Sequence, residues 1–141
     1  YVTDFPTTAL IDHPKVIALP HLGASTGEAE ENCAIMVAVN VKDYLENGNV
    51  RHSVNFPEAR LPRLDAWRIT IANANLPNKV GQISTCLANA GLNIEDLLNK
   101  TVGDLAYTIV DVNGEPSDAL LQELRDIDGV LALRNLGKPV T

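Results

Sequence analysis

Basic residues are scarce in this chain. Its 11 Lys and Arg residues stand against 18 Asp and Glu residues, which gives a formal net charge of −7. Nucleic acids and anionic membranes are bound by proteins that present a basic face. Because of this charge balance, we expect neither nucleic acids nor anionic membranes as partners.

Cysteine is also scarce. Cys33 and Cys86 each lie in an apolar helical pattern, so we expect two free, buried thiols in a reducing, cytoplasmic setting. A metal site needs clustered ligands, which these two residues do not provide, and no metal site is predicted. The sequence also has no apolar run long enough to span a membrane and no basic-then-apolar leader.

Nucleotide-binding glycine motifs are missing. The chain contains no G-x-G-x-x-G sequence and no P-loop with its lysine. A glycine-rich turn, GASTG, does occur at Gly23 to Gly27. We interpret it as a capped helix start in preference to a phosphate site, with Ser25 as the N-cap and Glu28 completing a capping box.

The chain divides into two regions joined by a linker. Residues 50–65 contain Pro57 and Pro62 and show no regular period, which is typical of a linker. The predicted domains are therefore residues 1–49 and residues 66–138. Because the chain begins at Tyr1, directly in a strand-like run, we expect it to be a fragment of a longer protein.

The first region reads as two strands and a long helix. YVTDF and the run from Val16 to Leu19 are strand-like, and a helix then continues to Asn47, before Gly48. Only Asn40 is not hydrophobic between Cys33 and Val41. A helix that is apolar nearly all round must be covered on several sides. We expect another part of the protein, or a partner chain, to cover it.

The second region predicts the order βαββαβ. Trp67, Ile69 and Ile71 alternate with Arg68, Thr70 and Ala72, as in a strand with one buried and one exposed face. The remaining signals are a helix from Pro77-Asn78 to Gly91, a strand from Asn93 to Val102, a turn at Gly103-Asp104, the strand LAYTIVDV, a helix capped by Ser117, and the strand VLALRNL. This is an α+β, ferredoxin-like fold with an antiparallel sheet and its helices on one face.

His21 is the candidate catalytic residue. It follows a strand and Pro20, and it precedes Gly23 and a helix start. A histidine at such a place can meet a ligand in a crevice, and its pKa range suits a general acid or base. A purely structural histidine remains the alternative at this point.

Four asparagines are candidate ligand contacts. Asn73 and Asn75 end the first strand of the second region, Asn78 opens the helix, and Asn93 begins the next strand. Amides both donate and accept hydrogen bonds, so together they suit a zwitterion such as an amino acid. The N-terminus of the helix favours the carboxylate of such a ligand. The alternative is that asparagine is simply common at caps and turns.

Both regions resemble parts of a known family. HPKVIALPHLGASTGEAEENCA is similar to the end of the Rossmann-type cofactor domain, with its last strands and long connecting helix, in NAD-dependent D-2-hydroxyacid dehydrogenases. The branch that oxidises 3-phosphoglycerate for L-serine biosynthesis is the most similar. WRITIANANLPNKVGQISTCLANAGLNIEDLLNKTVGDLAYTIVDVNG resembles an ACT regulatory domain.

The resemblance implies a catalytic role in a full-length enzyme. His21 would take the proton of the substrate hydroxyl, Gly23 and Ala24 would lie near the nicotinamide of NAD, and Asp4 would contact its amide. The cofactor loop, the catalytic arginine and most of the substrate domain have no counterpart in the sequence. We therefore expect this chain alone to be inactive.

One departure concerns the acid that orients the histidine. The family usually carries a carboxylate shortly after its Asp-x-Phe stretch, whereas this chain has Thr7 and Thr8 there. Asp12 is the nearest acid downstream. The sequence does not identify the partner of His21.

For the second region, the resemblance implies regulation and assembly. ACT domains pair edge to edge into homo-oligomers and bind an amino-acid effector, often L-serine, at that interface. Asn75, Asn78 and Asn93 are the expected effector-binding residues. Two alternatives remain: a dehydrogenase for another 2-hydroxy acid, and an ACT module that joins chains and binds no ligand.

Overall fold

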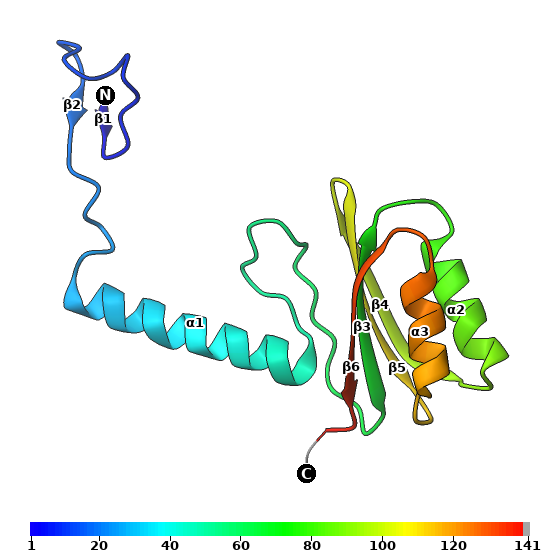
Figure 1. The fold of residues 1–141 in the computed structure, drawn as a ribbon. Helices are drawn as coiled ribbons and strands as arrows, with labels where there is room; N and C mark the ends of the chain where they lie inside the picture. Colours follow the sequence, from blue (N-terminus) through cyan, green and yellow to red (C-terminus); the bar gives the residue numbers. More distant parts are fainter. Residues whose placement is uncertain (140–141) are drawn as a thin grey trace. The chain divides into compact units, whose positions relative to one another are not determined.

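The computed structural model describes residues 1–139 of the chain (Figure 1). The chain forms two compact units, residues 1–39 and residues 40–141. The division falls within the long helix α1 (Gly27–Asn47), whose end belongs to the second unit. The three domain ranges expected from the sequence stay a prediction.

Two short strands form the first unit's sheet. β1 (Val2–Thr3) and β2 (Ile17–Ala18) pair in parallel. Only two residues of each predicted strand run are paired. Pro6 and Pro20 follow these runs, and proline cannot donate to a strand ladder. Since parallel strands end at the same edge of a sheet, the residues that follow β1 and β2 start on the same side.

The start of α1 differs from the predicted capping box. Thr26 Oγ1 accepts a hydrogen bond from Ala29 N at 3.1 Å, which makes Thr26 the N-cap. The prediction that Ser25 and Glu28 form a capping box was wrong by one residue. Both hydroxyl residues suit the position chemically, so the sequence pattern alone did not separate them.

None of the residues of α1 is buried. Ile35, Met36, Val37 and Val39 are about half exposed or more. Cys33, which was expected to be buried, is exposed, and Cys86 is partly buried. The expectation that something else covers this helix stays a prediction.

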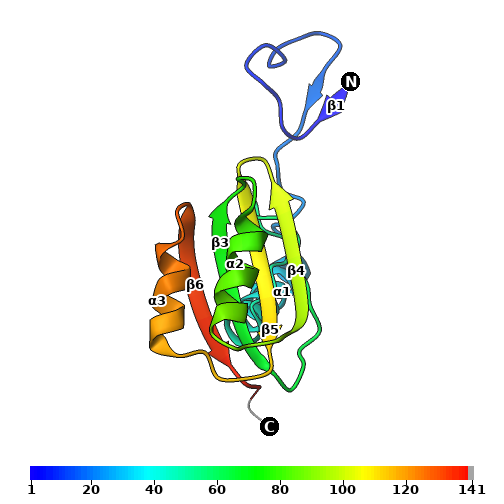
Figure 2. The ribbon, with the colours of Figure 1, turned by 90° about the vertical axis from the view of Figure 1, so that its right-hand side faces the viewer.

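The second unit contains the predicted βαββαβ fold. Its sheet has the order β4-β5-β3-β6, and all neighbouring strands are antiparallel. Helices α2 and α3 cover one face of this sheet (Figure 2). The elements in chain order are β3 (Trp67–Ala74), α2 (Lys79–Asn89), β4 (Ile94–Val102), β5 (Leu105–Val112), α3 (Asp118–Asp126) and β6 (Val130–Gly137).

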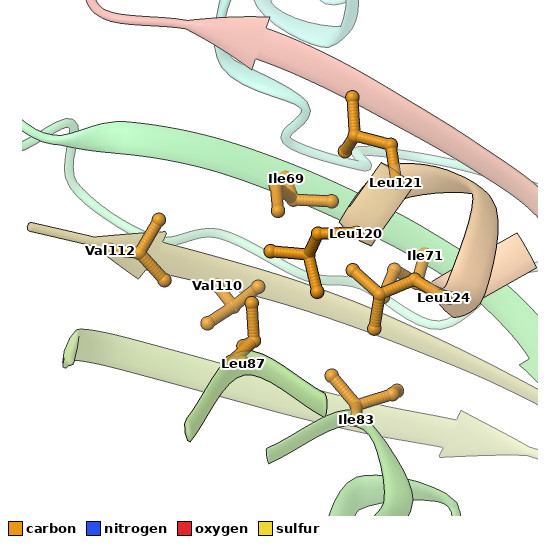
Figure 3. Packing of buried hydrophobic residues seen from close by; sticks show 9 residues of the cluster. All are labelled: Ile69, Ile71, Ile83, Leu87, Val110, Val112, Leu120, Leu121 and Leu124. Atoms are coloured by element: carbon orange, nitrogen blue, oxygen red, sulfur yellow. The ribbon is translucent and has the colours of Figure 1, made fainter. Parts of the chain in front are cut away.

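The main core lies between the sheet and its two helices. Figure 3 shows Ile83 and Leu87 of α2 and Leu120 and Leu124 of α3 directed at the sheet. They pack on alternate side chains of the central strands, namely Ile69, Ile71, Val110 and Val112. The aliphatic residues spaced along each helix and strand therefore pack into one interface. Together with the antiparallel sheet order, this interface confirms the α+β, ferredoxin-like class.

The other face of the sheet is also covered. Val50, Ala59 and Leu61, from the segment expected to be a linker, pack on Tyr107 and Ile109 in a second buried cluster. Val50 and Ala59 also form a β-bridge. The predicted exposed face of β3 was therefore wrong, and Arg68 and Thr70 are buried.

Candidate functional site

His21 lies beside a carboxylate. Its Nδ1 is 3.1 Å from Asp4 Oδ2, and the side chains are 64% and 54% exposed. The ring of Phe5 meets the imidazole edge to face, with centroids 5.4 Å apart. β1 and β2 bring these residues together because Asp4 follows one parallel strand and His21 follows the other.

This pairing fixes what His21 can do chemically. A carboxylate accepts a hydrogen bond from an imidazole N–H, so Asp4 favours the tautomer that carries its proton on Nδ1. Nε2 is then left with a lone pair that can accept a proton from a substrate. Asp4 is thus the carboxylate that lies beside His21, a neighbour that the sequence did not identify.

Gly23 and Ala24 lie in the loop between His21 and α1. A Cβ atom added at Gly23 would meet nothing within 4 Å, so this side of the loop is open. Both residues are exposed and follow His21 closely in the sequence. Their role in cofactor binding stays a prediction.

A second candidate site lies where β3 leads into α2. Three of the predicted asparagines, Asn73, Asn75 and Asn78, line a cavity of about 150 Å³. We call this space the asparagine cavity; its other lining residues are Leu76, Lys79, Val80, Gly81, Asn99 and Ala106. Asn93 is not among them, so a single chain brings three of the four asparagines together.

Asn73 is the most unusual residue of the asparagine cavity. The residue is only 1% exposed. Its Nδ2 donates to Ala74 O at 2.7 Å, whereas its Oδ1 has no hydrogen-bond partner within the described residues. A buried polar atom without a partner carries a desolvation cost of about 1–3 kcal/mol. A ligand that donates a hydrogen bond to Oδ1 would remove that cost.

Asn75 and Asn78 shape the loop around the asparagine cavity. Asn75 Nδ2 donates to Gly103 O at 3.0 Å, which ties the loop to the β4–β5 turn. Asn78 is the N-cap residue of α2, but it makes no side-chain cap hydrogen bond and has a left-handed backbone with φ 66°. Asn78 is at the predicted N-cap position, but its side chain does not cap the helix. Asparagine suits the position because it tolerates the left-handed backbone conformation.

The polarity of the asparagine cavity favours a zwitterion. The N-terminus of α2 presents free N–H groups and the positive end of the helix dipole, which suit a carboxylate. Asn73 Oδ1 suits an ammonium group. Lys79, 8% exposed, adds a cation whose Nζ donates to Gln82 Oε1 at 3.2 Å and to the carbonyl of Asp128.

Sequence reasoning missed Asn99. It lies on β4 and donates through Nδ2 to Thr108 Oγ1 at 3.0 Å. The only signal for it was a polar residue after the apolar pair Leu97-Leu98. Asn93 lies elsewhere on the chain, where its N–H donates to Asn113 Oδ1 at 3.0 Å.

Metal and membrane features are absent from the part of the chain that the structure describes. Among residues 1–139, no three His, Cys, Asp or Glu side chains gather in a way that could hold a metal ion. No described helix has the length and apolar character needed to cross a membrane.

Curated relatives match most of this chain. D-3-phosphoglycerate dehydrogenase of Haemophilus influenzae is 35% identical over 128 residues, covering 90% of this chain and 31% of the relative. The Escherichia coli enzyme is 30% identical over 132 residues, covering 92% and 32%. The chain therefore spans about a third of the length of these relatives, and it is homologous to their C-terminal part.

Solved structures resemble part of this chain more distantly. The ACT domain of GTP pyrophosphokinase from Chlorobium tepidum aligns with a TM-score of 0.44 and 18% identity, covering 50% of this chain and 95% of that domain. The regulatory subunit of aspartate kinase from Thermus thermophilus gives a TM-score of 0.42 and 17% identity, covering 50% and 51%. No protein-family model matches the chain.

Proposed function

We propose that this chain is the C-terminal part of an NAD-dependent D-3-phosphoglycerate dehydrogenase of L-serine biosynthesis. The full-length enzyme would convert 3-phosphoglycerate to 3-phosphohydroxypyruvate in the cytoplasm. Identity of 30–35% to dehydrogenases of that name supports the assignment. Residues 66–138 would form an ACT domain that senses an amino acid and pairs with a second copy of the chain.

The His21–Asp4 pair supports a catalytic role in the full-length enzyme. Asp4 holds the imidazole with Nε2 free, and Nε2 would accept the proton of the substrate hydroxyl while the substrate carbon loses a hydride. The carboxylate would also stabilise the imidazolium that forms. The proposal therefore makes Asp4 the partner that orients His21.

NAD is the cofactor that this function implies, and it would accept the hydride at its nicotinamide ring. The residues present fit one end of such a group, because the loop at Gly23 and Ala24 is open beside His21. Asp4 holds His21 through Oδ2, so any contact with the nicotinamide amide would use Oδ1. The chain contains no glycine motif for the pyrophosphate.

L-serine is the effector that we propose for the asparagine cavity. The observation that carries this proposal is Asn73 Oδ1, a buried acceptor without a partner within the described residues, on a residue that lines the asparagine cavity at the start of α2. The ammonium group of L-serine would donate to it, and the carboxylate would accept from the first N–H groups of α2. Asn75 and Asn78 would close the site, and Asn93 would come from the paired second copy.

Activity measurements test the catalytic part. In the full-length enzyme, His21→Asn should abolish turnover, and Asp4→Asn should lower kcat more than KM because it disturbs the tautomer of the base. The 141-residue chain alone should not reduce NAD with 3-phosphoglycerate. Normal turnover of the His21→Asn enzyme, or NAD reduction by the chain alone, would contradict the assignment.

Calorimetric titration with L-serine tests the sensing part. The chain should bind L-serine saturably, Asn73→Ala should weaken binding, and the matched control Asn89→Ala, at the far end of α2, should not. A second variant, Asn75→Ala, changes an exposed residue and separates loss of binding from loss of fold. If sedimentation shows an oligomer that binds no L-serine, the ACT domain is an assembly module or senses another ligand.

A further inference from the structure

The end of α1 is fastened to the sheet face opposite α2 and α3. The last turn of α1 has no basic residue, although its final carbonyl groups need partners and carry the negative end of the helix dipole. Side chains from the sheet supply those partners. Residues 40–63 thus form part of the second unit and cover this face (Figure 1).

Three strands each contribute one donor residue. Arg134 of β6 donates to Tyr44 O at 3.1 Å and to Leu45 O at 3.0 Å, and its guanidinium lies 4.5 Å from the centre of the Tyr44 ring. Arg68 of β3 donates to Asn47 O at 3.0 Å. Tyr107 of β5 donates through its hydroxyl to Gly48 O at 2.8 Å. We call Arg68, Tyr107 and Arg134 the α1 anchor.

Arg68 makes the α1 anchor rigid. Besides Asn47, it donates to Leu61 O, to Pro62 O and, through Nε and one Nη, to both carboxylate oxygens of Asp111 at 2.6 Å. These bonds use all five N–H donors of a guanidinium. The end of α1 and the segment after it therefore have one fixed attachment to β3.

The asparagine cavity is joined to β6, the strand that carries Arg134. Lys79 Nζ donates to Asp128 O, and Ala74 N donates to Gly129 O at 2.8 Å. Asp128 and Gly129 immediately precede β6. Two separate hydrogen bonds thus connect residues beside the asparagine cavity to the residues just before β6.

The pairing of β3 with β6 is irregular at both ends. The register shifts between Arg68 and Ile69 and again between Ala72 and Asn73. A bulge leaves one residue out of the ladder and lets the strand bend locally. Arg134, paired with Thr70, therefore lies in a short regular segment between two bulges, one at the α1 anchor and one at the asparagine cavity.

We propose that the α1 anchor couples the ligand state of the asparagine cavity to the end of α1. A hydrogen-bond donor bound at Asn73 Oδ1 would reduce the mobility of the residues beside the second bulge. The paired strand β6 would then become less mobile as well, and Arg134 would hold the carbonyls of Tyr44 and Leu45 more firmly. Along the chain, α1 is the segment that separates this sheet from His21. The inference rests on the proposed ligand role of the asparagine cavity and adds the route by which that ligand acts.

Amide hydrogen exchange of residues 40–49 tests this coupling on the full 141-residue chain. Saturating L-serine should slow exchange there at least about fivefold, the lower end of typical coupling. Arg134→Gln and the milder Tyr107→Phe should reduce this effect, whereas the matched control Arg125→Gln, on the exposed side of α3, should keep it. Because coupling is reciprocal, Arg134→Gln should also weaken L-serine binding.

The outcomes separate this inference from the proposed function. Bound L-serine that leaves exchange at residues 40–49 unchanged would overturn the coupling and keep the sensor. If L-serine does not bind, the effector proposal fails. The coupling is then tested by measuring amide exchange in the Asn73→Ala variant without ligand. That variant should still change exchange at residues 40–49 relative to Asn89→Ala; an identical rate would overturn the inference.

Discussion

Arg68 and Asp111 form an ion pair whose side chains are both 0% exposed. Removing two charges from water is costly, and close bidentate hydrogen bonds are needed to offset that cost. Once one partner is lost, the other remains buried and unpaired. The loss of one partner should therefore cost more stability than the loss of both.

Arg68→Met should destabilise the second unit by about 3–5 kcal/mol, because it leaves the Asp111 carboxylate buried without a partner. The double variant Arg68→Met with Asp111→Leu should lose less than the single variant, since it removes both charges. Urea unfolding of the three proteins measures this. A double variant less stable than the single one would show that the unpaired Asp111 carboxylate is not what destabilises the single variant.

Cys86 should react more slowly than Cys33 with a disulfide reagent at mildly alkaline pH. Burial raises the pKa of the Cys86 thiol, and the hydrogen bond to Glu123 and the charge of that carboxylate add to the effect. Only the thiolate reacts, and Cys33 is exposed. Rates for Cys33→Ser and Cys86→Ser variants give each thiol alone, and equal rates would contradict the described environment of Cys86.

Asp43 should contribute to the stability of the fold in a way that is lost at acidic pH. Burial tends to raise the pKa of its carboxyl, but hydrogen bonds from Asn47 and Asn49 and the charge of Arg51 outweigh it, so the folded pKa is lowered. Its stabilisation is then present above the unfolded pKa of about 3.9 and is lost as pH falls through the folded value.

Asp43→Asn tests this dependence. The variant should be less stable than the wild-type chain at about pH 6, and the difference should shrink toward about pH 3, where the carboxyl becomes protonated. Urea midpoints at both pH values measure the change. A difference that stays constant with pH would assign the effect to packing instead of charge.

At the scale of elements, helix ends connect the fold to its candidate sites. α1 begins just after the His21 loop and ends on the α1 anchor, and α2 begins at the asparagine cavity. Each of these ends leaves backbone groups without helical partners. Side chains satisfy them at both ends of α1, while at the start of α2 Asn78 makes no cap bond. Of these three helix ends, the start of α2 is the one that no side chain caps.

Thr26→Ala should weaken the first turn of α1 by about 1 kcal/mol, because it removes the oxygen that accepts from Ala29 N. Ser25→Ala, the matched control one residue earlier, should change little. Amide exchange of residues 29–31 reports the local loss. The reverse order of effects would restore the capping box predicted from the sequence.

The order of the elements in residues 67–137 could be predicted from the spacing of apolar residues and from turn residues, because those signals are local. The burial of Arg68 could not, since it depends on residues 48–63 folding back onto the sheet, and nothing local in WRITIA indicates that contact. Asp4 was missed as the partner of His21 for the same reason: a parallel pair of strands joins them. Asn73 was noticed in the sequence, but its unpaired buried oxygen appears only in the structure.

At the scale of the whole molecule, the chain corresponds to about a third of the dehydrogenases that it matches. Within it, the His21–Asp4 pair belongs to the first unit and the asparagine cavity to the second, and α1 contributes residues to both. Apolar side chains are exposed on α1, and β4 and β6 are the outer strands of the sheet. Along the chain, α1 is the element that connects the two proposed sites.

The central claim is that the asparagine cavity binds an amino acid, and side-chain amide signals of asparagine report on it directly. We would titrate L-serine into the chain labelled with nitrogen-15 at asparagine and follow the signals of Asn73, Asn75 and Asn78, with Asn89 as the internal control. The account predicts saturable shifts of the first three signals and none at the control. Unchanged signals at Asn73, or equal shifts at all four residues, would contradict it.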